Sequence, residues 1–293
     1  MRKLLLHITL LIIIWSSAAQ DAQFSQFYSN PLHLNPAFAG TAANTRIVAI
    51  HRIQWPNLPQ AFTNSSFSVD YNGDNINSGF GVLINRDQEG SAGLTNTSTS
   101  FIYSYTANLN DKVVIRPALK FGYVFRDIDR TQLVLGDQVD FGLDGAPSQD
   151  PQVNSIRLKN HWDIGTGVLI YTKKTWIGLA VDHLTSPNRS ILEGTDKLPF
   201  RYSIHIGSRY PLQKIVPIGT ITPTIAPSVL YRRQGNFQQL DAGASVHLQP
   251  VIVGLYYRGM PFLNSEFGLV NQDAIIVLAG LEYYNFEFNY SFD

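Results

Sequence analysis

The run VVIRPALKFGYVFR, from Val113 to Arg126, indicates the fold class more clearly than any other part of the chain. Every second position is mostly apolar, as at Phe121 and Tyr123, and the positions between them include Arg116 and Lys120. Because successive side chains of a strand point to opposite faces, the run predicts a β-strand with one apolar and one charged face. It is longer than the roughly 9–11 residues that a tilted strand needs to cross a bilayer, whereas globular strands average about 5–6. The run therefore favours a transmembrane strand.

The same alternation recurs from residue 44 onward, and turn residues such as Asn110-Asp111 and Gln249-Pro250 separate the runs. Tight turns of this kind indicate adjacent antiparallel strands. Bacterial barrels have even strand numbers, so we expect a transmembrane outer-membrane β-barrel of about 14 antiparallel strands. The expected strands span residues 44–53, 62–72, 79–86, 94–109, 112–127, 133–141, 161–171, 175–184, 200–210, 221–232, 239–248, 251–259, 274–283 and 284–292.

Two features count against parts of this reading. The run at 133–141 is the weakest and also fits a loop. Three prolines in the expected strands lack the backbone N–H that pairs neighbouring strands: Pro117, Pro223 and Pro227. A bulge, or a strand that continues beyond the membrane, would accommodate them.

Composition agrees with a membrane barrel. Charged residues make up 15% of the chain, against about 25% in an average soluble domain, and aromatics reach 12%. A soluble β-sandwich with a large core also fits the composition and the alternation, and strand length is what favours the membrane. The formal net charge of zero argues against nucleic acid as the main partner. The absence of cysteine excludes disulfides and cysteine metal sites.

The N-terminus has the pattern of a secretory signal peptide. Arg2 and Lys3 precede a short apolar region, and Ser17-Ala18-Ala19 supplies small residues for cleavage after Ala19. The apolar region is short for a membrane-spanning helix, although a retained anchor is the alternative. We therefore expect a signal peptide at 1–19 and a mature protein exported from the cytoplasm.

Residues 20–40 read QDAQFSQFYSNPLHLNPAFAG and do not alternate. Asn30-Pro31 and Asn35-Pro36 break any strand, and the spacing of the aromatic residues supports at most a turn or two of helix. Barrels of about 8 strands are filled by their own side chains, and those of about 16–18 leave a channel. We therefore expect residues 20–43 to form a plug-like segment in or under the lumen of a barrel at 44–293. A periplasmic linker is the alternative.

The same stretch, with its FSQFYSNPL and NPAFAG runs, resembles the opening of mature PorP/SprF proteins of the Bacteroidetes type IX secretion system. Weaker likenesses follow along nearly the whole mature chain, at 52–56, 68–71, 181–184, 227–232 and 254–259. The family commonly has one more segment after a strand like Tyr290-Ser291-Phe292-Asp293, where this sequence stops.

The resemblance implies a non-enzymatic outer-membrane protein, in contact with outer-membrane lipid. It would support export or cell-surface anchoring of a secreted, adhesin-like partner through the partner's type IX C-terminal domain. Periplasmic lipoproteins of the secretion machinery are further expected partners. A FadL-like channel for hydrophobic small molecules is the alternative, because Asn35-Pro36-Ala37 is similar to the N-terminal hatch of that family.

Two groups of residues are the candidate functional positions. The expected plug and partner-binding residues are Phe24, Gln26, Phe27, Tyr28, Asn30, Pro31, Asn35, Pro36, Ala37 and Gly40. The expected lumen-lining residues are Arg52, Trp55, Asp70, Arg116, Lys120, His183, Arg201 and Arg258. A charge facing lipid costs about 2–4 kcal/mol at mid-membrane, which favours the lumen for the arginines and lysine.

No catalytic or cofactor motif stands out. The histidines lack metal-type spacing, and there is no Gly-x-Ser-x-Gly elbow, so we expect no enzyme, cofactor or metal. An outer-membrane hydrolase and a lectin-like protein remain weaker alternatives. Asp137, Asp140, Asp144 and Asp150 match no known calcium loop and fit a solvated extracellular loop better than a calcium site.

Overall fold

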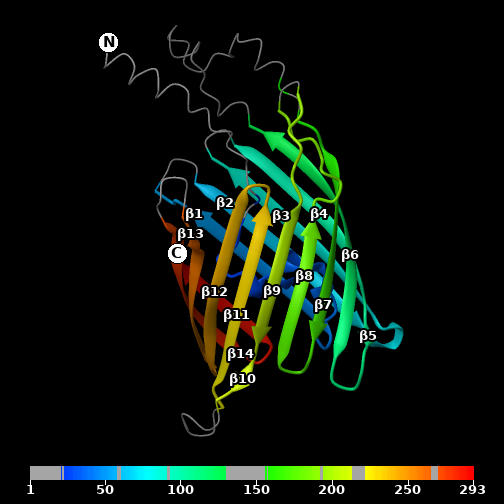
Figure 1. Ribbon diagram of the computed structural model, residues 1–293, viewed down its shortest axis with the longest axis vertical. Coiled ribbons are helices and arrows are strands. Elements are labelled where there is room, and N and C mark those ends of the chain that lie inside the picture. Colours follow the sequence, from blue (N-terminus) through cyan, green and yellow to red (C-terminus); the bar gives the residue numbers. More distant parts are fainter. Residues whose placement is uncertain are drawn as a thin grey trace.

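A computed structural model describes residues 21, 23–57, 61–90, 93–129, 156, 158–191, 194–212, 222–264 and 270–293. Fifteen antiparallel strands form one sheet that curls into a barrel-shaped wall (Figure 1). In the parts of the chain so described, no helix has both the length and the apolar character needed to span a membrane.

The long strands follow the expected ranges closely. Their bounds are β1 (Thr45–Gln54), β2 (Phe62–Gly73), β3 (Ser78–Glu89), β4 (Leu94–Tyr105), β6 (Val114–Ile128), β7 (His161–Tyr171), β8 (Thr175–Asp182), β9 (Arg201–Ser208), β11 (Thr224–Gln234), β12 (Phe237–Leu248), β13 (Val251–Asn264), β14 (Val270–Tyr283) and β15 (Phe286–Phe292). Two-residue strands β5 (Ala107–Asn108) and β10 (Tyr210–Pro211) pair with β6 and β11. The all-β prediction is confirmed, while the signal peptide, the run at 133–141 and the aspartates at 137–150 lie outside the described residues.

Each long strand pairs with the next one along the chain, so the sheet is an up-and-down meander from β1 to β15. One end of the wall carries the long connections 129–160 and 183–200, and we call it the long-loop end. The other end carries the tight connections 172–174 and 249–250, and we call it the short-turn end. β1 runs from the short-turn end to the long-loop end.

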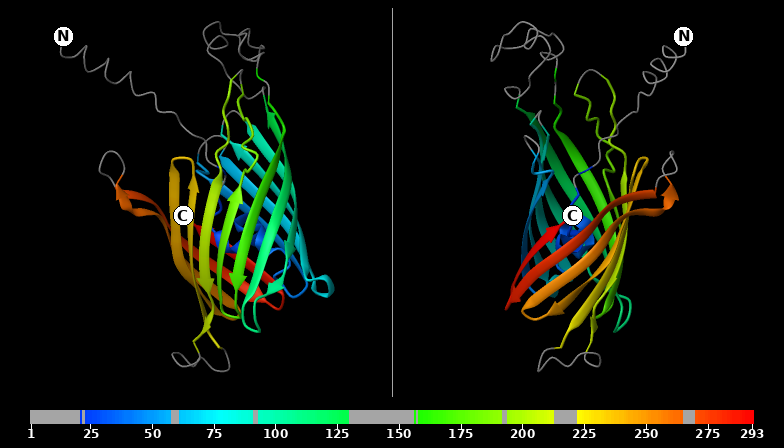
Figure 2. Two further views of the ribbon diagram at one scale, coloured as in Figure 1. Left: turned by 45° about the vertical axis from the view of Figure 1, so that its right-hand side comes forward. Right: turned by 90° about the vertical axis from the view of Figure 1, so that its left-hand side faces the viewer.

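The two edges of the sheet approach one another. Among the described residues no ladder joins β1 to β15, and alternation of direction along the meander makes these two strands run the same way. The Arg52 guanidinium of β1 lies 2.8 Å from the carboxylate of Asp293, which follows β15. Figure 2 shows the C-terminal strand passing in front of the N-terminal segment inside the wall.

The two faces of the wall differ as the alternation predicted. Phe101 and Phe121 face outward, with about half of each side chain exposed (51% and 48%), and Leu255 is 60% exposed. Arg116 and Arg258 point inward and are each 2% exposed. A soluble sandwich would bury its apolar face, so this arrangement of apolar outside and polar inside is that of a membrane barrel.

The prolines sit where the neighbouring ladder is interrupted. On the side of β4 and β5, the pairing of β6 skips Arg116 and Pro117. On the side of β9 and β10, the pairing of β11 skips Ala226 and Pro227. Pro223 precedes β11. A proline has no amide hydrogen to donate, so an interruption is where it disturbs the sheet least.

Candidate functional site

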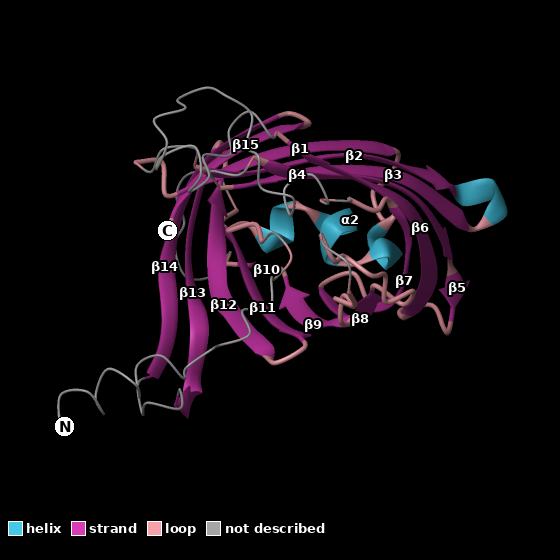
Figure 3. Ribbon diagram, turned by 90° about the horizontal axis from the view of Figure 1, so that it is seen from above, coloured by secondary structure: helices cyan, strands magenta, loops and turns pink. Residues whose placement is uncertain are grey.

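Residues 23–43, together with Asp21, form what we call the luminal segment. It contains three short helical turns, η1 (Phe27–Ser29), α2 (Pro31–Leu34) and η2 (Pro36–Phe38). Seen from above, these turns lie inside the ring of strands (Figure 3). Both Asn-Pro steps start a turn, because proline at the first helical position lacks only a hydrogen that has no helical partner. The expected plug thus lies within the lumen.

Asn35 fixes the middle of the luminal segment to the wall. Its Oδ1 accepts a hydrogen bond from the Ala37 amide at 2.9 Å and caps η2. Its Nδ2 donates to the carbonyl oxygens of Val168 on β7 (3.2 Å) and Leu179 on β8 (3.0 Å). The same Nδ2 lies 3.0 Å from Nε2 of His205 on β9. One buried side chain therefore joins the segment to three wall strands.

Arg116 holds the part of the segment nearest the short-turn end. Its Nη2 donates to the carbonyl oxygen of Ala39 (2.8 Å), and its Nη1 donates to that of Gly40 (3.0 Å). Ser104 Oγ donates to the same Ala39 oxygen (2.7 Å). The Gly40 amide donates to Asp70 Oδ2 (2.8 Å). Gly40 has φ of 69°, which a residue with a side chain adopts at a cost.

Asp21 holds the other end, near the long-loop end of the wall. Its carboxylate accepts from His183 Nε2 (2.5 Å) and from Arg201 Nη1 (3.1 Å). The other ring nitrogen of His183 lies 3.0 Å from Asp163 Oδ1. Burial lowers the pKa of His183, but the carboxylates of Asp21 and Asp163 outweigh it and raise that pKa to about 9. The imidazolium therefore joins two carboxylates at neutral pH.

Two wall arginines bind the backbone just after Asp21. Arg52 Nη1 donates to the Gln23 carbonyl oxygen (2.9 Å), and Arg258 Nη2 donates to that of Phe24 (3.3 Å). The guanidinium of Arg258 also pairs with Asp241 (2.8 Å). Elsewhere in the wall, Asp182 pairs with Lys120 and Arg201, so these buried charges are neutralised.

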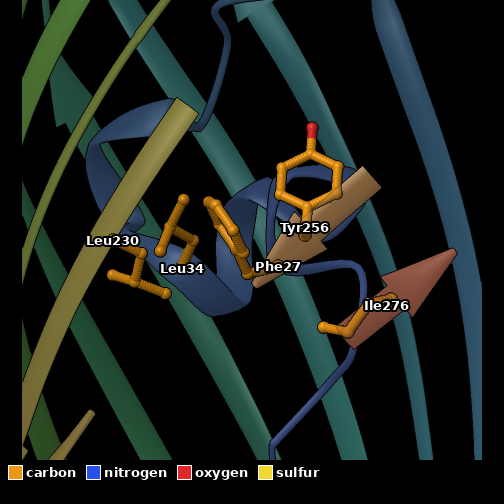
Figure 4. Close-up of a cluster of buried hydrophobic side chains, with 5 residues drawn as sticks. All are labelled: Phe27, Leu34, Leu230, Tyr256 and Ile276. Carbon is orange, nitrogen blue, oxygen red and sulfur yellow. The ribbon is translucent and has the colours of Figure 1, made fainter. Parts of the chain in front are cut away.

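Apolar contacts also hold the luminal segment against the wall. Phe27 and Leu34 of the segment pack with Leu230, Tyr256 and Ile276 of the wall (Figure 4). In a second cluster, Leu32 and Ala39 of the segment pack with Leu83 and Ile102 of the wall. In a third, Ala37 of the segment packs with Ala118 and Leu169 of the wall. Full burial of a large apolar side chain contributes about 1.5–3 kcal/mol, so these contacts make the lumen a stable site for the segment.

Wall glycines make room for the segment. A Cβ on Gly79 would lie 2.2 Å from the Ala39 carbonyl oxygen, and one on Gly167 would lie 2.1 Å from Asn35 Oδ1. The nearest neighbour of each Cβ belongs to the luminal segment, while Arg116 and Ser104 of the wall would also lie 2.6 Å from the one on Gly79.

Most predicted positions come together at this interface, and a few do not. Trp55 lies beyond the end of β1, is 55% exposed and packs edge-on against Phe62, so it is not part of the luminal wall. Gln26 is half-buried, and its side chain makes no hydrogen bond with any described residue. Asn30 is buried, and its amide likewise has no partner among them. The prediction missed His205, although it lies on the polar face of an alternating run.

Comparison with protein families gives one result that covers the chain. The sequence model described as type IX secretion system membrane protein PorP/SprF matches residues 16–293. No curated protein sequence matches the chain. The family match includes the luminal segment and every long strand of the wall. The chain therefore belongs to the PorP/SprF family of type IX secretion system membrane proteins.

Proposed function

We propose that this protein is an outer-membrane anchor that supports export, cell-surface attachment, or both, of a secreted adhesin-like partner. The partner's type IX C-terminal domain docks on the connections of the long-loop end or on the lumen mouth there. Outer-membrane barrels have short periplasmic turns and longer extracellular loops, so the long-loop end faces outward. The short-turn end then faces the periplasm, where lipoproteins of the secretion machinery meet it.

The occupied lumen is the observation that carries this proposal. Asn35, Arg116 and Asp21 fix the luminal segment to the wall at three heights, and apolar clusters fill the space between. Passage of a polypeptide would first require all these contacts to break. A barrel whose lumen is filled in this way suits an anchor that holds a partner better than a conduit through which the partner moves.

The proposal includes no catalysis. The lumen charges Lys120, Asp182, Arg201, Asp241 and Arg258 are paired with one another, and Arg116 binds backbone carbonyl groups of the luminal segment. Groups so occupied are poor candidates for acid–base work, and we propose that the protein is not an enzyme and uses no cofactor. The amino-terminal signal peptide would direct its export.

Deletion of the gene, followed by complementation, tests the proposal. We expect the adhesin-like partner to accumulate inside the cells or to be shed into the medium, while other type IX substrates are still secreted. Surface labelling and western blots of cells and medium separate these outcomes. Normal surface display of the partner in the deletion strain would refute the proposal.

A channel for hydrophobic small molecules is the second candidate function. It is favoured by an apolar pocket at the short-turn end, beneath the luminal segment. The charged wall residues Lys120, Asp182 and Arg201 count against an oily passage. Loss of uptake of such compounds on deletion, with the partner still displayed, would favour the channel over the anchor.

A further inference from the structure

The pocket beneath the luminal segment has features of a ligand site. It has a volume of about 290 Å³ and lies between the segment and the β7–β9 part of the wall. This volume is near the lower end of the about 300–1,000 Å³ of small-molecule pockets. The turn at 172–174 lines it, so it belongs to the short-turn end.

The body of the pocket is apolar on both sides. The luminal segment contributes Phe27, Leu34 and Phe38. The wall contributes Tyr171 and Trp176, together with the ring of His205, which stacks on Phe38 with 5.3 Å between ring centres. Such a lining accepts an alkyl chain or an aromatic ring, because either removes apolar surface from water.

The rim of the pocket is cationic. Lys173, Lys174 and Arg209 line it and are exposed. None of these three forms an ion pair with a described residue, whereas Arg46, which also lines the pocket, is bound to Asp70. The described lining contains no aspartate or glutamate. The rim thus attracts an anionic group at the place where the apolar body opens.

We infer that this pocket binds a single-chain amphiphilic anion, with the alkyl chain between Phe38 and Trp176 and the carboxylate at Lys174 and Arg209. The separation of an apolar body from an unneutralised basic rim matches the two ends of such a molecule. The inference concerns binding at the short-turn mouth and does not depend on the partner-anchoring function or on transport.

Tryptophan fluorescence gives a direct test, because the chain has four tryptophans and one of them lines the pocket. The protein for the test keeps Trp176 alone, through Trp15→Phe, Trp55→Phe and Trp162→Phe, and is held in amphipol. The probe is undecanoate with bromine on its last carbon, which quenches tryptophan on contact. We expect saturable quenching by this probe and binding at least roughly fivefold weaker for the matching bromo-alcohol, which lacks the charge.

Charge reversal at the rim of the pocket is a second test of the proposed binding. Lys174→Glu combined with Arg209→Glu should weaken binding of the probe roughly tenfold. Lys112→Glu is the matched control, because Lys112 is exposed at another turn of the same end and does not line the pocket. Heat-modifiable gel migration confirms that each variant is folded. Quenching that does not saturate, equal binding of acid and alcohol, or binding unchanged by the double reversal would each overturn the inference.

Discussion

The Nδ2 atom of Asn35 lies 3.0 Å from Nε2 of His205, although 170 positions separate the two residues in the sequence. Asn35 Oδ1 is already the acceptor for the Ala37 amide, which orients the side-chain amide. An amide NH₂ group has two hydrogens, and here they are shared among the carbonyl oxygens of Val168 and Leu179 and the ring nitrogen of His205. One side chain of the luminal segment therefore contacts β7, β8 and β9 together.

Loss of the Asn35 side chain should release the middle of the luminal segment. Asn35→Ala removes the cap of η2 and two hydrogen bonds to wall carbonyls, each worth about 0.5–1.5 kcal/mol. We expect the free energy of unfolding to fall by roughly 2–4 kcal/mol, measured by urea titration in lipid vesicles. Gln26→Ala is the control and should change it by less than about 0.5 kcal/mol. Equal effects of the two substitutions would contradict this role for Asn35.

A side chain at Gly79 should displace the segment from the wall. In Gly79→Ala the new Cβ would lie 2.2 Å from the Ala39 carbonyl oxygen, and such overpacking costs about 1–3 kcal/mol. Single-channel conductance in planar bilayers should rise, and the temperature of heat-modifiable migration should fall. Gly254→Ala is the matched wall control, since the three atoms nearest its Cβ would be wall atoms of Leu278 and Tyr256 at 3.3–3.4 Å. A silent Gly79→Ala variant would mean that the segment does not rest on this part of the wall.

The two hydrogen bonds of the Arg116 guanidinium should stabilise the fold in addition to its charge. Arg116→Ala leaves the carbonyl oxygen of Gly40 without its donor, and we expect a loss of about 3 kcal/mol or more in the free energy of unfolding. Arg116→Lys retains the charge but cannot bind two carbonyl groups in the same plane, so it should restore only part of that loss. Protease digestion of the luminal segment and urea unfolding report the two effects. Full recovery in Arg116→Lys would show that charge alone suffices.

The contact between Asp21 and His183 should depend on pH. The pKa of His183 is raised to about 9, above the roughly 6.5 of an unfolded histidine. The stabilisation is therefore complete below about pH 6.5 and is lost as the pH rises through about 9. Thermal midpoints of the wild type and His183→Gln should differ most near pH 6.5 and converge by pH 10. A difference between the two thermal midpoints that grows as the pH rises would contradict this prediction.

His51→Gln serves as the control for that experiment. The ring of His51 bonds to Ser65 Oγ at 2.9 Å and has no carboxylate partner in the described part of the chain. Its thermal midpoint should follow that of the wild type across the same pH range.

Alternation was enough to predict the strands, because Arg116, Lys120, Arg201 and Arg258 had to avoid lipid and Phe121 had to meet it. The Asn-Pro steps predicted that the start of the mature chain is not a strand. The partners of the segment were not predictable, since a contact such as Asn35 with His205 depends on how far the sheet curls. The role of Gly79 was hidden for the same reason, because a glycine does not reveal which neighbour needs its space.

A disulfide lock tests the central claim that the luminal segment stays in place while the protein works. Ala37 and Ala118 belong to one buried cluster, and the chain has no cysteine of its own. In cells that make the Ala37→Cys/Ala118→Cys variant, the account predicts that the disulfide forms and that the adhesin-like partner still reaches the surface and stays there. Ala37→Cys paired with Ala242→Cys on β12 should remain reduced. Failure of the lock to form, or a partner held inside the cells until the disulfide is reduced, would contradict the account.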